Sequence, residues 1–147
     1  MGQSAVLIRD ENIKLEDLIS GVKQALDNLG YLYNEEPYEG YTILYVRENQ
    51  EYDDRQLLFY LLEKPRDKYV NYDYQWIKKG VMHVVTVDRF YDREDMLLKF
   101  VHAYLDIFPN DFFYDEMELY YTKADIDRIW SMPFDYTWCY KNPSEIE

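Results

Sequence analysis

The chain has 147 residues, a formal net charge of −13 and an aromatic content of 18% that includes 17 tyrosines. Its length fits one domain, 1–147, with a sizeable core. The charge disfavours nucleic acid and anionic membranes as partners and favours a basic protein, although high charge also serves solubility alone. We expect some tyrosine rings at the surface, because each buried hydroxyl group needs a hydrogen-bond partner.

The first predicted element is a helix, because apolar residues recur along it at helical spacing. They are Leu15, Leu18, Ile19, Val22, Ala25, Leu26 and Leu29. Asn12 is the candidate N-cap and Gly30 the stop signal. The apolar run at 5–8 is shorter than the core of a signal peptide, and no stretch matches a membrane span. Together with a single cysteine, Cys139, which excludes an internal disulfide, this predicts a cytoplasmic protein, with export by a route that needs no cleaved signal as the alternative.

The middle of the chain predicts antiparallel strands. These are 31–33, 41–47, 57–62, 70–76 and 81–87. A polar loop is expected at 34–40, after the first of them. The run 57–62 is also compatible with a short helix ended by Pro65. Period-2 alternation in 70–76 predicts a hairpin with 81–87.

Two further helices are predicted from capping patterns and apolar stripes. Asp92 followed by Asp95 begins the helix at 92–107. The buried stripe of that helix is Leu97, Phe100, Val101, Tyr104 and Ile107. Thr122 followed by Asp125 begins the helix at 122–130. The residues of this last helix that are expected to face inward are Ile126, Ile129 and Trp130.

Alternation of aromatic and polar residues in 134–140 predicts a final strand. The elements together predict an α+β fold, with an antiparallel meander sheet of about five to six strands packed against two longer helices and one short helix. We find no internal repeat and no linker that would divide the chain.

The sequence carries no motif for catalysis or for a cofactor. It contains no glycine-rich phosphate loop and no Gly-x-Ser-x-Gly elbow, and Cys139 fits an ordinary buried cysteine. His102 and Asp106 have the spacing of two metal ligands on one helix face, but only His83 offers a second imidazole. We therefore predict a helix-surface contact for this pair, and no catalytic, cofactor-binding or metal-binding residue.

Carboxylates and aromatic rings are concentrated in 106–127, and this acidic run is the predicted binding surface. Carboxylates attract Lys and Arg, and the rings supply contact area and cation–π stacking. The residues predicted to bind the partner are Asp111, Tyr114, Asp115, Glu116, Glu118 and Tyr120. A second candidate patch consists of Glu51, Asp53 and Asp54. The alternative is that Asp111 and Asp115 only form turns, within a solvated rim of charge.

The segment FPNDFFYDEMELYYTKADIDRIW, at 108–130, is similar in style to segments of the immunity proteins that bacteria make against their own toxins. The resemblance implies a tight one-to-one complex with a toxin domain, often a basic nuclease, whose active site is occluded. Two other functions stay open. One is a small hydrolase that uses paired carboxylates in an aromatic cleft, and the other is a homo-oligomeric regulatory or scaffold protein.

Overall fold

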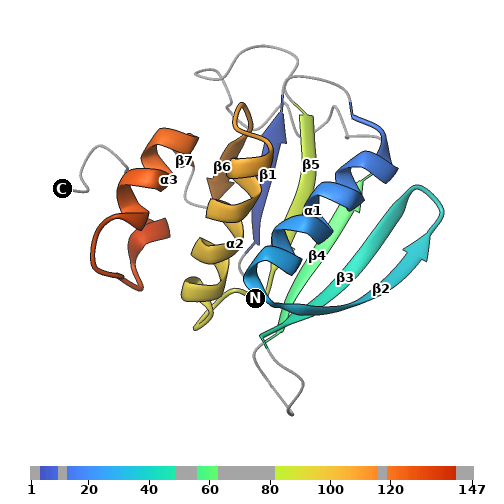
Figure 1. Cartoon of the computed structure of the whole chain (residues 1–147), viewed down its shortest axis with the longest axis horizontal. Coiled ribbons are helices and arrows are strands. Elements are labelled where there is room, and N and C mark those ends of the chain that lie inside the picture. Colours follow the sequence, from blue (N-terminus) through green and yellow to red (C-terminus); the bar gives the residue numbers. More distant parts are fainter. Residues whose placement is uncertain (1–3, 10–12, 49–55, 63–81, 116–118, 142–147) are drawn as a thin grey trace.

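The computed structural model describes residues 4–9, 13–48, 56–62, 82–115 and 119–141. Within these residues the chain forms an antiparallel sheet of seven strands, with three α-helices on one of its faces (Figure 1). The α+β fold is therefore confirmed, with a sheet slightly larger than the predicted five to six strands. That the chain is one domain stays a prediction.

The strands lie in the spatial order β2-β3-β4-β5-β1-β6-β7. In chain order, the elements are β1 (Ser4–Arg9), α1 (Leu15–Leu29), β2 (Leu32–Tyr38), β3 (Tyr41–Arg47), β4 (Gln56–Leu62), β5 (Met82–Asp88), α2 (Glu94–Ile107), β6 (Phe112–Asp115), β7 (Tyr120–Tyr121), α3 (Lys123–Trp130) and the 3₁₀ helix η2 (Trp138–Tyr140). The predicted strands at 41–47, 57–62 and 81–87 are confirmed, the last shifted by one residue. The predicted strand at 70–76 and its hairpin lie outside the described residues.

Strand β1 was not predicted, although it lies in the middle of the sheet between β5 and β6. Its side chains are buried on both faces, with Leu7 in the main core and Ile8 in a smaller cluster on the other side. A strand buried on both faces shows an apolar run without alternation. The run at 5–8 has that form, but four residues are too few to distinguish a strand from other buried segments.

Strand β2 contradicts the predicted loop at 34–40. It continues to Tyr38, which pairs with Tyr41 of β3 across a two-residue turn. Gly40 adopts φ 84 in this turn, a left-handed conformation that glycine reaches without steric cost. The strand was missed because it is an edge strand whose residues from Asn34 onward are exposed, so its sequence has no apolar alternation.

The main core fills the space between the sheet and the helices. Helix α1 ends as predicted, with Gly30 at φ 73 and its amide bonded to the carbonyls of Leu26 and Asp27. Lys14 is the N-cap, and the predicted cap, Asn12, lies outside the described residues. In the middle of α1, a Cβ on Gly21 would approach the ring of Phe108 to 2.3 Å, so this glycine allows α1 to pack against the end of α2.

The predicted N-cap of α2 is wrong, whereas the predicted capping box of α3 is confirmed. Helix α2 begins at Glu94 after Arg93, and Asp92 adopts φ 63 in the preceding loop. In α3, the Thr122 hydroxyl accepts from the Asp125 amide at 3.3 Å, and the Asp125 carboxylate accepts from the Thr122 amide at 3.0 Å. Trp130 does not face inward as predicted, since it is 43% exposed.

The predicted final strand at 134–140 is also wrong. The segment forms turns and then η2, whose buried Trp138 donates from Nε1 to the carbonyl oxygen of Glu94 at 2.9 Å. The alternating pattern failed because Tyr136 and Phe134 are exposed while Trp138 and Cys139, which are adjacent, are both buried. No described helix combines the length and the apolar character needed to cross a membrane.

Candidate functional site

Two carboxylates of the predicted surface are buried, so the expected exposure of Asp111 and Asp115 is corrected. Asp111 is 4% exposed, accepts from the Tyr104 hydroxyl at 2.8 Å and lies 3.7 Å from Arg9 Nη1. Asp115 is 3% exposed, and its Oδ1 accepts from the Leu119 amide at 3.3 Å. Both carboxylates serve the fold: Asp111 links β1 to α2, and Asp115 at the end of β6 binds the amide of Leu119 next to β7.

The remaining predicted residues divide into two groups. Tyr114 is buried and Tyr120 half-buried, and both lie on the sheet face opposite the helices. The others lie outside the described residues; they are Glu116, Glu118, Glu51, Asp53 and Asp54. The described residues among those predicted to bind the partner therefore do not form an exposed acidic surface.

A different surface emerges on the face of the sheet that no described helix covers. The cross-strand register places one residue from each of the seven strands in a single row. In spatial order, the row consists of Glu36, Ile43, Tyr60, Thr86, Val6, Tyr114 and Tyr120. Within this row, the side chains of Tyr60, Thr86 and Tyr120 are half-buried. The register of the sheet thus places Tyr60, Tyr114 and Tyr120 on the same face.

The edge of this face carries what we call the hairpin cluster, defined as Glu36, Tyr38, Tyr41 and Tyr45. The hydroxyls of Tyr38 and Tyr45 both donate to Oε2 of Glu36, at 2.7 and 3.2 Å. The rings of Tyr38 and Tyr41 stack with centroids 4.9 Å apart and planes 11° apart. Tyr38 is 47% exposed. The cluster is therefore an accessible carboxylate surrounded by phenol rings.

The electrostatics of the hairpin cluster follow from this carboxylate. The hydrogen bond to Glu36 raises the pKa of Tyr38 to about 12, and the negative charge of Glu36 adds to the effect. Burial raises the pKa of Tyr45, with the charge of Glu36 as the next cause. Both hydroxyls therefore stay protonated and donate to Glu36 throughout the neutral pH range.

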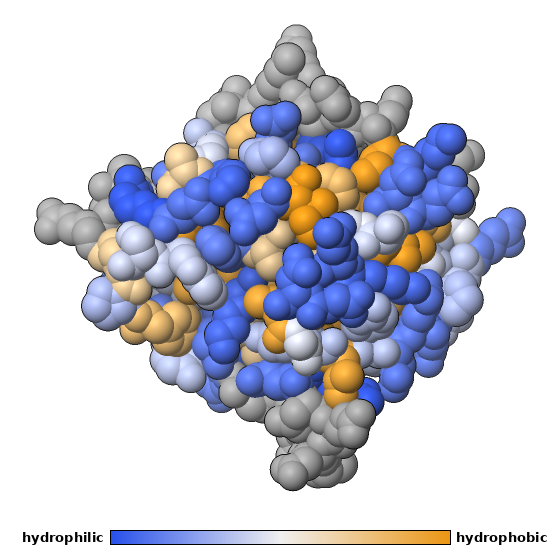
Figure 2. All heavy atoms as spheres, viewed as in Figure 1, coloured by the Kyte–Doolittle hydropathy of each residue, from blue (hydrophilic) through white to orange (hydrophobic). Residues whose placement is uncertain are grey.

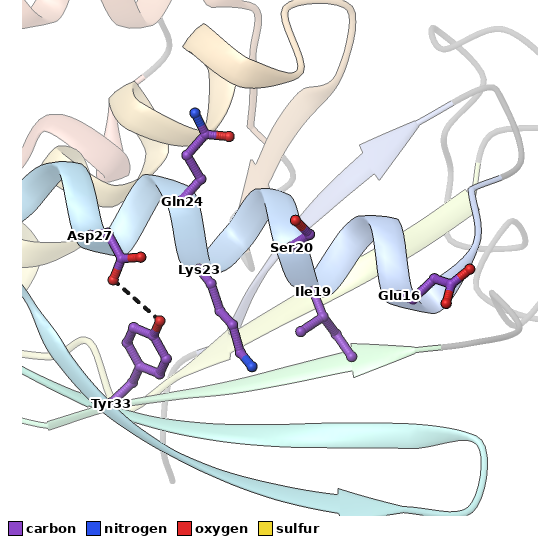
Figure 3. Close-up of a pocket in the computed structure, with 7 residues that line it drawn as sticks. All are labelled: Glu16, Ile19, Ser20, Lys23, Gln24, Asp27 and Tyr33. Atoms are coloured by element: carbon purple, nitrogen blue, oxygen red, sulfur yellow. Dashed lines mark hydrogen bonds between the residues drawn. The ribbon is translucent and has the colours of Figure 1, made fainter.

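The other side of β2 forms an open groove with α1, of about 490 Å³ (Figure 3). It is lined by Glu16, Ile19, Ser20, Lys23, Gln24, Asp27 and Tyr33. Two contacts link its walls: Lys23 Nζ lies 2.7 Å from Glu35 Oε1, and the Tyr33 hydroxyl donates to Asp27 Oδ1 at 3.2 Å. Burial, and then the charge of Asp27, raises the pKa of Tyr33. These two contacts connect α1 to β2 across the groove.

His102 belongs to a network of polar contacts that joins α2 to α3. Its Nε2 lies 3.5 Å from Asp127 Oδ1, and its ring stacks on Trp130 with centroids 4.2 Å apart. The ligand atoms of His102, Asp106 and Asp127 lie within 4.8 Å of one another, a spacing suited to a metal ion. However, Nζ of Lys123 is 3.1 Å from Asp106 and 2.7 Å from Asp127, so an ammonium group already balances both carboxylates.

The helical side of the molecule presents a mostly hydrophilic surface, interrupted by smaller hydrophobic areas (Figure 2). Comparisons with models of protein families, with curated proteins and with solved structures find no match to this chain. The hairpin cluster was missed because 34–40 was interpreted as a loop. The signal that marks it is Gly40 between two tyrosines, because glycine adopts the left-handed conformation of this turn without steric cost.

Proposed function

We propose that this protein is a non-catalytic binding protein of the bacterial immunity or antitoxin kind, which acts in the cytoplasm. It neutralises a basic toxin domain by covering the active site of that domain with an acidic, tyrosine-rich surface. The observation that carries the proposal is the hairpin cluster, in which Glu36 lies among three tyrosines at an exposed edge of the sheet. The resemblance of 108–130 to immunity proteins agrees with the same function.

Two physical effects support a basic partner. The net charge of −13 attracts it over distance, and such steering raises association rates by roughly tenfold to a thousandfold at low salt. On contact, tyrosine rings provide large buried area at a small cost in side-chain entropy. Glu36 accepts from tyrosine hydroxyls and forms no ion pair with a described basic side chain, so its charge is available for the partner in this second step.

The proposal predicts that reversing the charge of the hairpin will slow association. The double variant Glu36→Lys, Glu39→Lys is expected to associate at least about tenfold more slowly at low salt and with a weaker salt dependence. The partner is first captured from the native host with the wild-type chain and identified by mass spectrometry. Association rates are then measured by stopped-flow fluorescence at several salt concentrations.

The matched control is the double variant Glu16→Lys, Asp17→Lys, which changes the net charge equally on the exposed first turn of α1. Its association rate should fall much less than that of the hairpin variant, because the charges lie on the helical side of the sheet. Circular dichroism checks that both variants fold. Equal rates for the two variants would contradict a role for the hairpin, and an acidic or uncharged partner would contradict the function.

A further inference from the structure

We infer that the hairpin cluster is a receptor for one arginine side chain of the protein partner. The inference rests on the proposed function, because it names the chemical group that the same surface recognises. A guanidinium group would bond to Glu36 and stack on a neighbouring tyrosine ring. The occupant is thus a protein that presents an exposed arginine to this edge of the sheet.

The Glu36 carboxylate has one oxygen, Oε1, that accepts no hydrogen bond from a described residue. Both tyrosine hydroxyls donate to the same oxygen, Oε2. No described donor reaches Oε1, and no described basic side chain forms an ion pair with this carboxylate. The adjacent Glu35 differs, since it points to the other side of β2 and pairs with Lys23 at 2.7 Å. Glu36 therefore keeps one oxygen and its negative charge for an external cation.

The tyrosine rings of the hairpin cluster favour an arginine side chain over a lysine side chain. The rings of Tyr38 and Tyr41 are nearly parallel, and the Tyr45 hydroxyl donates to the same carboxylate oxygen as the Tyr38 hydroxyl. A planar guanidinium can lie on a tyrosine ring while its N–H groups point sideways to a carboxylate. An ammonium group has no flat face for stacking and is more strongly hydrated. The surface of rings beside a carboxylate oxygen thus fits the shape as well as the charge of arginine.

Other occupants fit the hairpin cluster less well. An anionic ligand is repelled by Glu36, and an apolar one would cover its Oε1 and leave that oxygen without a hydrogen-bond donor, which is unfavourable. A second copy of this chain would bring together two molecules that each carry a net charge of −13. A basic side chain from a different protein satisfies the charge and uses the rings.

The test is an NMR titration of the ¹⁵N-labelled protein with two neutral-backbone probes, N-acetyl-arginine methylamide and N-acetyl-lysine methylamide. The arginine probe should shift the backbone amides around the hairpin cluster, and it should bind about two- to fivefold more tightly than the lysine probe. Equal shifts for the two probes, or shifts that centre on another part of the chain, would overturn the inference. Light scattering at the same protein concentration should give the mass of a monomer, and a dimer whose interface includes the hairpin would overturn it too.

Two variants localise the effect. Glu36→Gln keeps the shape of the side chain but removes its charge, and it should weaken binding of the arginine probe by about two- to fivefold. Glu39→Gln removes a charge from the same hairpin without touching the described tyrosine contacts, so it should retain wild-type binding. Equal weakening by both variants would show attraction to general negative charge and would overturn an arginine receptor.

The titration and the association experiment together distinguish a failure of the inference from a failure of the proposed function. If the arginine probe does not bind but the hairpin reversal slows association with a basic partner, the arginine receptor is wrong and the proposed function stands. If the probe binds at Glu36 but the captured partner associates equally well with the reversed hairpin, the hairpin recognises a guanidinium group that this partner does not supply, and the proposed function is wrong.

Discussion

Replacing Trp138 with alanine is expected to lower the free energy of unfolding by about 3–5 kcal/mol. The side chain is 2% exposed and packs against the rings of Phe113 and Tyr121, with centroids 5.5 and 5.7 Å away. Its Nε1 also donates to the carbonyl oxygen of Glu94 at the start of α2. The substitution removes a large buried side chain and leaves a cavity where the C-terminal segment meets the core.

The matched control is Tyr136→Ala in the same segment, where the side chain is 54% exposed. Its effect should stay within about 0.5 kcal/mol, as for most surface substitutions. Urea unfolding followed by circular dichroism measures both variants. A loss below about 1 kcal/mol for Trp138→Ala would contradict the burial of this residue, since cavities of that size cost more.

Raising the pH above about 10 is expected to destabilise the protein steeply. Burial, followed by the charge of Asp111, raises the pKa of Tyr104 well above its usual value, and burial likewise raises that of Tyr121. Below about pH 10 both phenols are neutral in the folded and the unfolded chain, so they add no pH dependence. Above it, the unfolded chain releases protons that the folded chain retains. The free energy of unfolding then falls by about 1.4 kcal/mol per pH unit for each of the two tyrosines.

Urea unfolding between pH 8 and pH 11 measures this dependence. Burial also raises the pKa of the Cys139 thiol, so this group adds to the loss from about pH 9. Tyr104→Phe is the diagnostic variant: it removes the donor to Asp111 and lowers stability at neutral pH, but its alkaline slope should be smaller by about 1.4 kcal/mol per unit. An unchanged slope in this variant would contradict a buried, protonated Tyr104.

The sequence predicted those elements whose burial is one-sided or whose ends carry a local signal. The stripe from Leu15 to Leu29 identifies α1 because one face of a helix meets a core, and Thr122 with Asp125 identifies the start of α3 because the contact is local. Strands 41–47 and 57–62 were recognisable from β-branched, aromatic and apolar residues.

Features decided by distant contacts were not predictable. Asp111 looks like a turn residue in sequence, but a hydroxyl from α2 and a guanidinium from β1 allow its carboxylate to be buried. The aromatic alternation ends at Trp138, whose buried indole donates to the carbonyl oxygen of Glu94, 44 residues earlier in the chain. The hairpin cluster was hidden for the opposite reason, because an exposed edge strand such as β2 carries no apolar pattern.

Photo-crosslinking in the native host tests directly whether the hairpin binds a basic protein. A photoreactive benzoylphenylalanine replaces Tyr41 in one variant and Trp130, an exposed ring on α3, in the other. We expect a covalent adduct with one basic protein from the Tyr41 position and none from the Trp130 position. An adduct from Trp130 alone, or equal adducts from both positions, would contradict it.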